Sequence, residues 1–67
     1  MNVTMDLSKL SYETKIALAK DEQSSPEFFV ALSTDKDPRI RKIVARNENT
    51  PVEVLDFLAK DKDWWVR

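Results

Sequence analysis

The side chains that most often carry acid–base or nucleophilic chemistry are scarce in this sequence. Its 67 residues include no histidine, no cysteine and no glycine, so a thiol nucleophile, a thiolate metal site and a glycine-rich phosphate loop are all excluded by composition. Carboxylates such as Glu22 and Glu27 remain, but a chain this short offers little depth in which to shift a pKa. We therefore expect no catalytic residues, no cofactor and no enzymatic activity.

Four aspartates form two Asp-Lys-Asp stretches, which are the densest acidic clusters in the chain. They are Asp35, Asp37, Asp61 and Asp63. A divalent cation is one interpretation, but the stretches lack the glycine and the ligand spacing of a calcium loop. Aspartate is also a preferred residue at helix starts and turns, so we predict caps and turns here and no metal ion.

Basic side chains at helical spacing form a second candidate site. Arg39, Lys42 and Arg46 are three and four residues apart, which places them on one stripe of a helix. Such a stripe can follow nucleic-acid phosphates, whereas an ordinary solvated helix face shows the same spacing. The chain has a net charge of −1, so nucleic acid is the less favoured partner. At the equivalent positions of the first unit defined below, only Lys20 is basic, so we expect the stripe to stop there.

Both tryptophans of the chain lie together in the segment Trp64-Trp65-Val66-Arg67. Paired aromatic side chains and arginine are favoured at protein interfaces, so Trp64, Trp65 and Arg67 are the predicted partner-binding residues. In the alternative interpretation, Trp64 folds back and caps the hydrophobic core, as the ends of repeat arrays require. A third alternative is that the chain is a fragment of a longer array, and the segment is a repeat junction.

These residues belong to a sequence that repeats. Aligning residues 16–41 with residues 42–67 needs no gap and gives eight identical pairs, all 26 positions apart. The pairs are Ala19 and Ala45, Glu22 and Glu48, Glu27 and Glu53, Leu32 and Leu58, Asp35 and Asp61, Lys36 and Lys62, Asp37 and Asp63, and Arg41 and Arg67. We predict one domain over 1–67, with a cap or arm at 1–10, repeats at 11–36 and 37–62, and the start of a third helix at 63–67.

Capping residues and prolines predict two short helices in each repeat. Ser-Pro, Asp-Pro and Thr-Pro pairs place a side-chain acceptor and a proline where a helix begins, which predicts helices near 11–21, 25–34, 38–46 and 51–60. Thr50 with Glu53, and Ser24 with Glu27, have the spacing of a capping box. Since there is no glycine, we expect Asn47 and Asn49 to take the left-handed conformation after a helix.

The apolar spacing predicts one core shared by the helices. One predicted group is Ile40, Ile43, Val44, Val54, Leu55 and Leu58, and the matching first-repeat group is Ala17, Leu18, Phe28, Phe29 and Leu32. Small side chains at Ala19 and Ala45 allow close helix approach. Val3, Met5, Leu7 and Leu10 are expected to cover the first repeat.

The elements Val44-Ala45-Arg46-Asn47, Thr50-Pro51, Leu55, Leu58-Ala59, Asp61 and Val66-Arg67 occur in this order. Together they resemble the leucine-rich repeat variant family, which is similar to the HEAT and armadillo repeats. In the first repeat Asp21 replaces the asparagine and Ser33 replaces the alanine. The resemblance implies an all-α, right-handed solenoid that serves as a binding scaffold. Some relatives are associated with cysteine-ligated clusters, for which this chain has no ligands.

The sequence therefore predicts a non-catalytic protein–protein interaction module that binds through its C-terminal end or its exposed helix faces. The expected partner is another protein, including a second copy of this chain, and nucleic acid is the alternative. No apolar run approaches the roughly 20 residues of a membrane span, and no secretory signal is recognisable, so we expect a cytoplasmic protein with no membrane partner.

Overall fold

The computed structural model of the chain describes residues 7 and 9–67, and it is all-helical, as the sequence predicts. Its four helices are α1 (Tyr12–Lys20), α2 (Pro26–Leu32), α3 (Pro38–Arg46) and α4 (Val52–Leu58), and the described residues form no strand. The predicted helices lie at these places, each within two residues at either end. Val3 and Met5 lie outside the described residues.

Side-chain caps begin the two nine-residue helices. The Ser11 hydroxyl accepts a hydrogen bond from the Thr14 N–H, and the Asp37 carboxylate accepts one from the Arg39 N–H. Each bond satisfies a backbone donor that has no partner within its helix. The starts of α1 and α3 are therefore predicted correctly from the sequence.

The predicted capping boxes of α2 and α4 are wrong. The Ser24 and Thr50 hydroxyls donate backward instead, to the Leu18 carbonyl at 2.9 Å and to the Val44 carbonyl at 2.6 Å. Both acceptors lie in the last turn of the preceding helix, where carbonyl groups have no partner within the helix. These hydroxyls therefore tie a helix end to the turn that follows it.

The expected left-handed asparagines are also wrong. No described residue has a positive φ, and Asn47 lies in the extended region with φ −76°. Its carboxamide stabilises the turn by side-chain bonding: Oδ1 accepts from the Asn49 N–H at 2.9 Å, and Nδ2 donates to the Ala19 carbonyl at 2.8 Å. An Asx turn thus replaces the glycine-type helix end.

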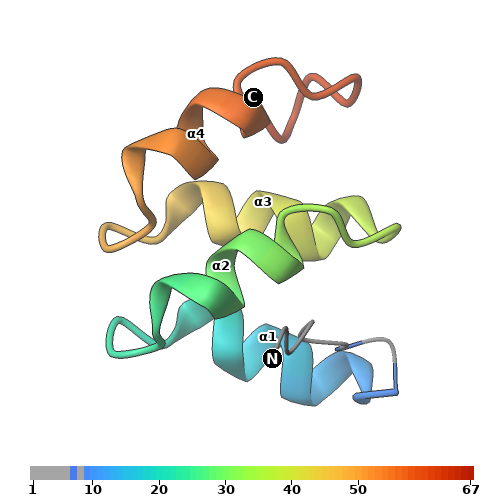
Figure 1. The fold of residues 1–67 in the computed structure, drawn as a ribbon. Helices are drawn as coiled ribbons and strands as arrows, with labels where there is room; N and C mark the ends of the chain where they lie inside the picture. Colours follow the sequence, from blue (N-terminus) through green and yellow to red (C-terminus); the bar gives the residue numbers. More distant parts are fainter. Residues whose placement is uncertain (1–6, 8) are drawn as a thin grey trace, which may run out of the picture.

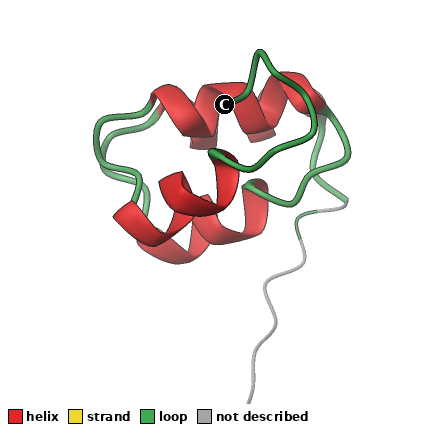
Figure 2. Cartoon of the chain, turned by 90° about the horizontal axis from the view of Figure 1, so that it is seen from above, coloured by secondary structure: helices red, strands yellow, loops and turns green. Residues whose placement is uncertain are grey.

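The helices follow one another along the molecule in chain order, from α1 at one end to α4 at the other (Figure 1). Helix α1 packs against α2 and α3, and α3 packs against α2 and α4, so α3 is the central element. The connecting turns gather at the two ends of the helices when the molecule is seen along the perpendicular direction (Figure 2). The molecule measures 33 × 22 × 20 Å.

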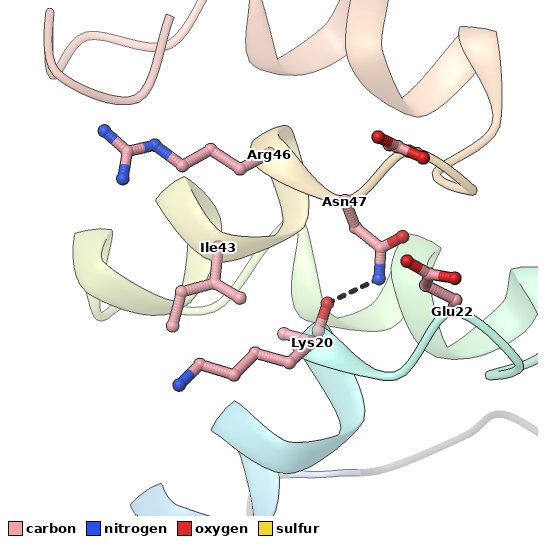
Figure 3. A pocket seen from close by; sticks show the side chains of 7 residues that line it. Lys20, Glu22, Ile43, Arg46 and Asn47 are labelled. Atoms are coloured by element: carbon pink, nitrogen blue, oxygen red, sulfur yellow. Dashed lines mark hydrogen bonds between the residues drawn. The ribbon is translucent and has the colours of Figure 1, made fainter.

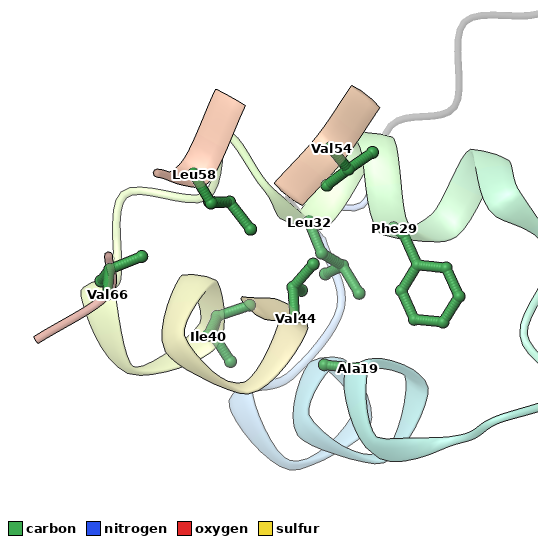
Figure 4. Close-up of a cluster of buried hydrophobic side chains, with 8 residues drawn as sticks. All are labelled: Ala19, Phe29, Leu32, Ile40, Val44, Val54, Leu58 and Val66. Atoms are coloured by element: carbon green, nitrogen blue, oxygen red, sulfur yellow. The ribbon is translucent and has the colours of Figure 1, made fainter. Parts of the chain in front are cut away.

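One hydrophobic core joins all four helices (Figure 4). Its buried members are Ala19, Phe29, Leu32, Ile40, Val44, Val54, Leu58 and Val66, and Leu7, Ile16, Leu18, Ile43 and Ala45 pack at its edge. Two predicted core residues are wrong, because Ala17 and Leu55 are exposed on their helices. In α4 the buried face consists of Val54 and Leu58, so Leu55 lies beside it, and in α1 the buried residue is Ala19, so Ala17 lies outside the core.

The expected helix start at Asp63 is a single hydrogen-bonded turn. The Val66 N–H donates to the Asp63 carbonyl at 2.9 Å, as the Ile40 N–H donates to the Asp37 carbonyl at 3.1 Å in α3. Val66 is only 3% exposed and enters the core. The turn therefore places one apolar side chain inside and leaves its neighbours outside.

Candidate functional site

A groove at the α4 end of the molecule brings together residues from both predicted sites. It encloses about 290 Å³ between α3, α4 and the turn at 63–66, and we call it the Trp65 groove. Its lining residues are Lys42, Ala45, Arg46, Leu55, Leu58, Ala59, Trp65, Val66 and Arg67. The predicted nucleic-acid residues Lys42 and Arg46 therefore share one surface with the predicted partner-binding residues Trp65 and Arg67.

The local structure of α3, of α4 and of the turn at 63–66 explains why their side chains line the groove. Lys42 and Arg46 are one turn apart on α3, so their side chains lie on the same face. Leu55 is exposed in the groove because Val54 and Leu58 direct the apolar face of α4 into the core. Trp65 is carried by the turn that buries Val66. The lining therefore combines apolar side chains with three cationic ones.

The Trp65 groove is strongly biased in charge. Three of its lining residues are cationic, and none is acidic. Within residues 7 and 9–67, no ion pair engages Lys42, Arg46 or Arg67. In a chain with a net charge of −1, this is a local concentration of positive charge that favours an anionic ligand.

Arg39, the third member of the predicted basic stripe, lies apart from the groove. Its Nε and Nη2 donate to the Asp37 carboxylate at 3.0 and 2.8 Å, and its guanidinium carbon lies 4.4 Å from the centre of the Tyr12 ring. The side-chain hydrogen bond from Arg39 lowers the pKa of Asp37 below its ordinary value, so the pair is fully ionised at neutral pH. Within the described residues, the members of the stripe that have no ion pair are therefore Lys42 and Arg46.

The two tryptophans differ in environment. Trp64 is 72% exposed and does not line the groove, so the interpretation of Trp64 as a cap over the core is wrong; Val66 fills that position. Trp65 is 41% exposed, and the two rings meet edge to face with their centres 5.8 Å apart. This is a favoured geometry for an aromatic pair, so the two rings stabilise each other.

No family model matches this chain, and no curated protein or solved structure matches it either. The site is therefore interpreted from its own geometry. No helix in the described part of the chain is long and apolar enough to cross a bilayer. The described residues also include no group of three or more acidic side chains placed to hold a metal ion.

The two Asp-Lys-Asp turns have a structural role, which explains why aspartate is concentrated in them. Arg41 is buried, with its side chain 9% exposed; its Nε donates to Asp61 Oδ2 at 2.7 Å, and its Nη2 also bonds Asp63. Lys15 Nζ contacts Asp35 Oδ2 at 2.8 Å in the same manner. Basic residues of the first and third helices thus anchor the two turns, for which the sequence predicted only a capping and turn-forming role.

A second hollow, lined by two cationic side chains, lies beside the groove and was not predicted from the sequence. Lys20 and Arg46 lie on either side of Ile43, with their side chains directed to the same side of the molecule (Figure 3). The hollow that they line encloses about 350 Å³ and also includes Glu22 and Glu48. The 26-residue spacing of Lys20 and Arg46 is the sequence signal that could have identified this pair.

A further hollow lies between α2 and α4. It is lined in part by Val30 and Phe57, which are 55% and 54% exposed. Neither residue falls on the apolar face that the helical period predicts, so the spacing of apolar residues did not select them. Ser33, Thr34 and Glu53 complete its lining together with Val54, so the lining has a single charged side chain and no cluster of charges that would favour a particular ligand.

Proposed function

We propose that this chain is a non-catalytic protein-binding module of helical-repeat architecture, in which the Trp65 groove takes an acidic, amphipathic segment of a partner protein. The observation that carries the proposal is the composition of the groove: exposed Leu55 and Trp65 share its lining with Lys42, Arg46 and Arg67, and no acidic side chain is among the lining residues. Tryptophan and arginine are the side chains most enriched among residues that dominate binding energy.

Recurrent hydrogen bonds support the repeat architecture. The bonds of Ser24 to Leu18 and of Thr50 to Val44 are 26 residues apart, and the Asx bond of Asp21 to Gln23 also recurs at that spacing. The corresponding bond of Asn47 to Asn49 completes the second pair. The resemblance to the leucine-rich repeat variant family also favours stacked units in a right-handed solenoid. On this proposal, the groove lies at the end of the stacked units, where apolar side chains of the last unit are exposed.

A protein ligand fits the groove better than nucleic acid does. Phosphate binding needs several free cations along a track, and the predicted stripe loses Arg39 to Asp37. The groove instead combines three cations with apolar side chains in one lining, which suits a helix with one acidic and one apolar face. A phosphate backbone would pair with the cations but would leave these apolar side chains without a partner.

Binding of designed peptides tests the proposal. The probes are a fluorescein-labelled 14-residue helix of Leu, Ala and Glu, the same peptide with Gln at every Glu, and a 15-nucleotide oligothymidine, followed by anisotropy. We expect the acidic peptide to bind at least about tenfold more tightly than the Gln peptide, because only the former meets the three cations. Tighter binding of oligothymidine, with a steep loss of affinity in salt, would instead favour the nucleic-acid function.

Two aromatic variants locate the site. Trp65→Ala should weaken the acidic peptide roughly tenfold or more while the circular dichroism spectrum is unchanged. Phe57→Ala removes an aromatic side chain of similar exposure that does not line the groove, so it should leave the affinity unchanged. If Phe57→Ala weakens binding and Trp65→Ala does not, the site is the hollow between α2 and α4, and the proposal is wrong.

A further inference from the structure

Three basic residues occupy equivalent positions along the chain, and two of them have the same kind of partner. Lys15, Arg41 and Arg67 are spaced by 26 residues. Lys15 Nζ contacts Asp35 at 2.8 Å, and Arg41 Nε contacts Asp61 at 2.7 Å. In each case the aspartate stands 20 residues after the base and begins an Asp-Lys-Asp turn. The position shared by Lys15 and Arg41 therefore binds a carboxylate in both cases.

The backbone carries Arg67 in the same way as Arg41. Val66 and Ile40, the residues just before them, are both buried, and their N–H groups donate to the carbonyls of Asp63 and Asp37. Arg67 thus follows a turn that matches the first turn of α3. Its side chain differs in being exposed in the Trp65 groove, with no ion pair to any described residue.

The Asp-Lys-Asp turn is preorganised to meet such a base. The N–H of its second aspartate donates to the carboxylate of the first, at 2.8 Å for Asp37 to Asp35 and at 2.9 Å for Asp63 to Asp61. This bond fixes the first carboxylate and leaves its other oxygen, and the second carboxylate, available to an external donor. Arg41 bonds both aspartates of its turn, whereas Lys15 contacts only the first.

We infer that Arg67 binds an Asp-x-Asp turn of the partner protein, at the end of the apolar segment that occupies the Trp65 groove. A planar guanidinium can hold both carboxylates of such a turn, as Arg41 does. The inference rests on the proposed function, because it requires a protein segment in the groove.

The partner is a chain other than a second copy of this one. The aspartates of both turns are already paired within the molecule: Asp35 with Lys15, Asp37 with Arg39, and Asp61 and Asp63 with Arg41. A second folded copy would have to break one of these pairs before it offered its turn. Arg67 therefore selects for a partner whose Asp-x-Asp turn is free.

A double-mutant cycle tests the inference. The first probe, the Asp peptide, is a synthetic peptide with the sequence of residues 52–63, blocked at both ends. As a free peptide it combines an apolar helical segment with an unpaired Asp-Lys-Asp. The second probe, the Asn peptide, carries Asn in place of both of these aspartates. Affinities for the intact chain are measured by anisotropy with labelled peptides. Arg67→Gln should weaken the Asp peptide roughly tenfold and leave the Asn peptide unchanged, because a hydrogen bond to a charged group is lost in the first case only.

Two further variants separate a specific contact from general attraction. Arg67→Lys keeps the charge and should retain part of the preference, through one aspartate, as Lys15 does. Lys42→Gln also removes one groove charge. The Asn peptide has as many lysines as acidic residues, whereas the Asp peptide has two more acidic residues, so general attraction alone should make Lys42→Gln weaken the Asp peptide more than the Asn peptide. If Arg67→Gln reduces the preference for the Asp peptide over the Asn peptide by no more than Lys42→Gln does, Arg67 contributes only general attraction and the inference is wrong.

The failure of the inference can be distinguished from the failure of the proposed function. If Trp65→Ala weakens binding of the Asp peptide but Arg67→Gln has no effect on it, the groove binds a protein segment but Arg67 does not recognise the Asp-x-Asp turn. If neither peptide binds at up to about 1 mM, or if Trp65→Ala has no effect on either, both statements are wrong. Unfolding in urea should be the same for Arg67→Gln and the unmodified chain, because Arg67 is exposed.

Discussion

Replacing Arg41 by methionine should destabilise the fold more than any other exchange of a charged residue. Methionine retains most of the side-chain volume and removes the four donated bonds, which reach Asp61, Asp63 and the Asp35 carbonyl. The Asp61 side chain is only 8% exposed, so it would be left as a buried, uncompensated charge beside a second carboxylate. Breaking a buried ion pair in this way typically costs about 3–5 kcal/mol.

We place the loss for Arg41→Met near the lower limit, at about 3 kcal/mol, because Asp61 keeps its bond from the Asp63 N–H and Asp63 is partly exposed. A domain of this size has a total stability of roughly 3–10 kcal/mol, so the variant should lie close to its unfolding transition at 25 °C. Urea unfolding followed by circular dichroism at pH 7 measures the difference.

Matched variants make the result interpretable even if Arg41→Met does not fold. Arg41→Lys should lose about 1 kcal/mol, since lysine keeps the charge and one contact, as Lys15 does with Asp35. Adding Asp61→Asn and Asp63→Asn to Arg41→Met should recover part of the stability, because the uncompensated charges are removed. A loss below about 1 kcal/mol for Arg41→Met itself would refute the reasoning, since the turn would then not depend on the guanidinium.

Other measurements test the remaining parts of the structure. Leu58→Ala should cost about 2–5 kcal/mol in urea unfolding by leaving a cavity in the core, and Phe57→Ala, beside it on α4 but exposed, should cost less than about 1 kcal/mol. Asn47→Ala should cost about 1–3 kcal/mol, because the carbonyl of Ala19 and the Asn49 N–H lose their partner; an equal loss for exposed Glu48→Ala would contradict this. Burial raises the pKa of Asp61, but the bonds from the Asp63 N–H and from Arg41 outweigh it and hold the pKa below its ordinary value. The resulting stabilisation is therefore complete above the ordinary aspartate pKa and is lost as the pH falls through the lowered one. Urea midpoints between pH 7 and pH 2 should therefore fall at the acid end, and the gap between the unmodified chain and Arg41→Met should narrow there.

The local elements of this protein follow from the sequence alone. Helix starts are encoded within a few residues, since Ser11 and Asp37 need only their own next turn to act as caps. The core could be predicted for the same reason: at Ile40 and Val44 the helical period alone indicates which face is buried. Composition is sufficient to exclude cysteine and histidine chemistry within these 67 residues.

Which side chains of one element contact another element depends on tertiary packing. The sequence gives no sign that Arg41 is buried. It is buried because the distant turn of Asp61 and Asp63 and the nearby carbonyl of Asp35 converge on it. Asn47 was expected to act through its backbone, but the packing of α1 against α3 gives its side chain the Ala19 carbonyl. Such contacts join residues roughly 20–30 positions apart, which local propensity does not register.

The candidate site shows the same division. The residue types at Lys42, Arg46, Trp65 and Arg67 could be selected from their spacing and chemistry, but as two separate sites with different ligands. The structure joins them in one groove, because burial of Val66 brings the turn at 63–66 against α3 and α4. It also removes Arg39, which pairs with Asp37 only two residues away. The chemical groups are therefore readable in the sequence, and the packing of the last turn decides which of them act together.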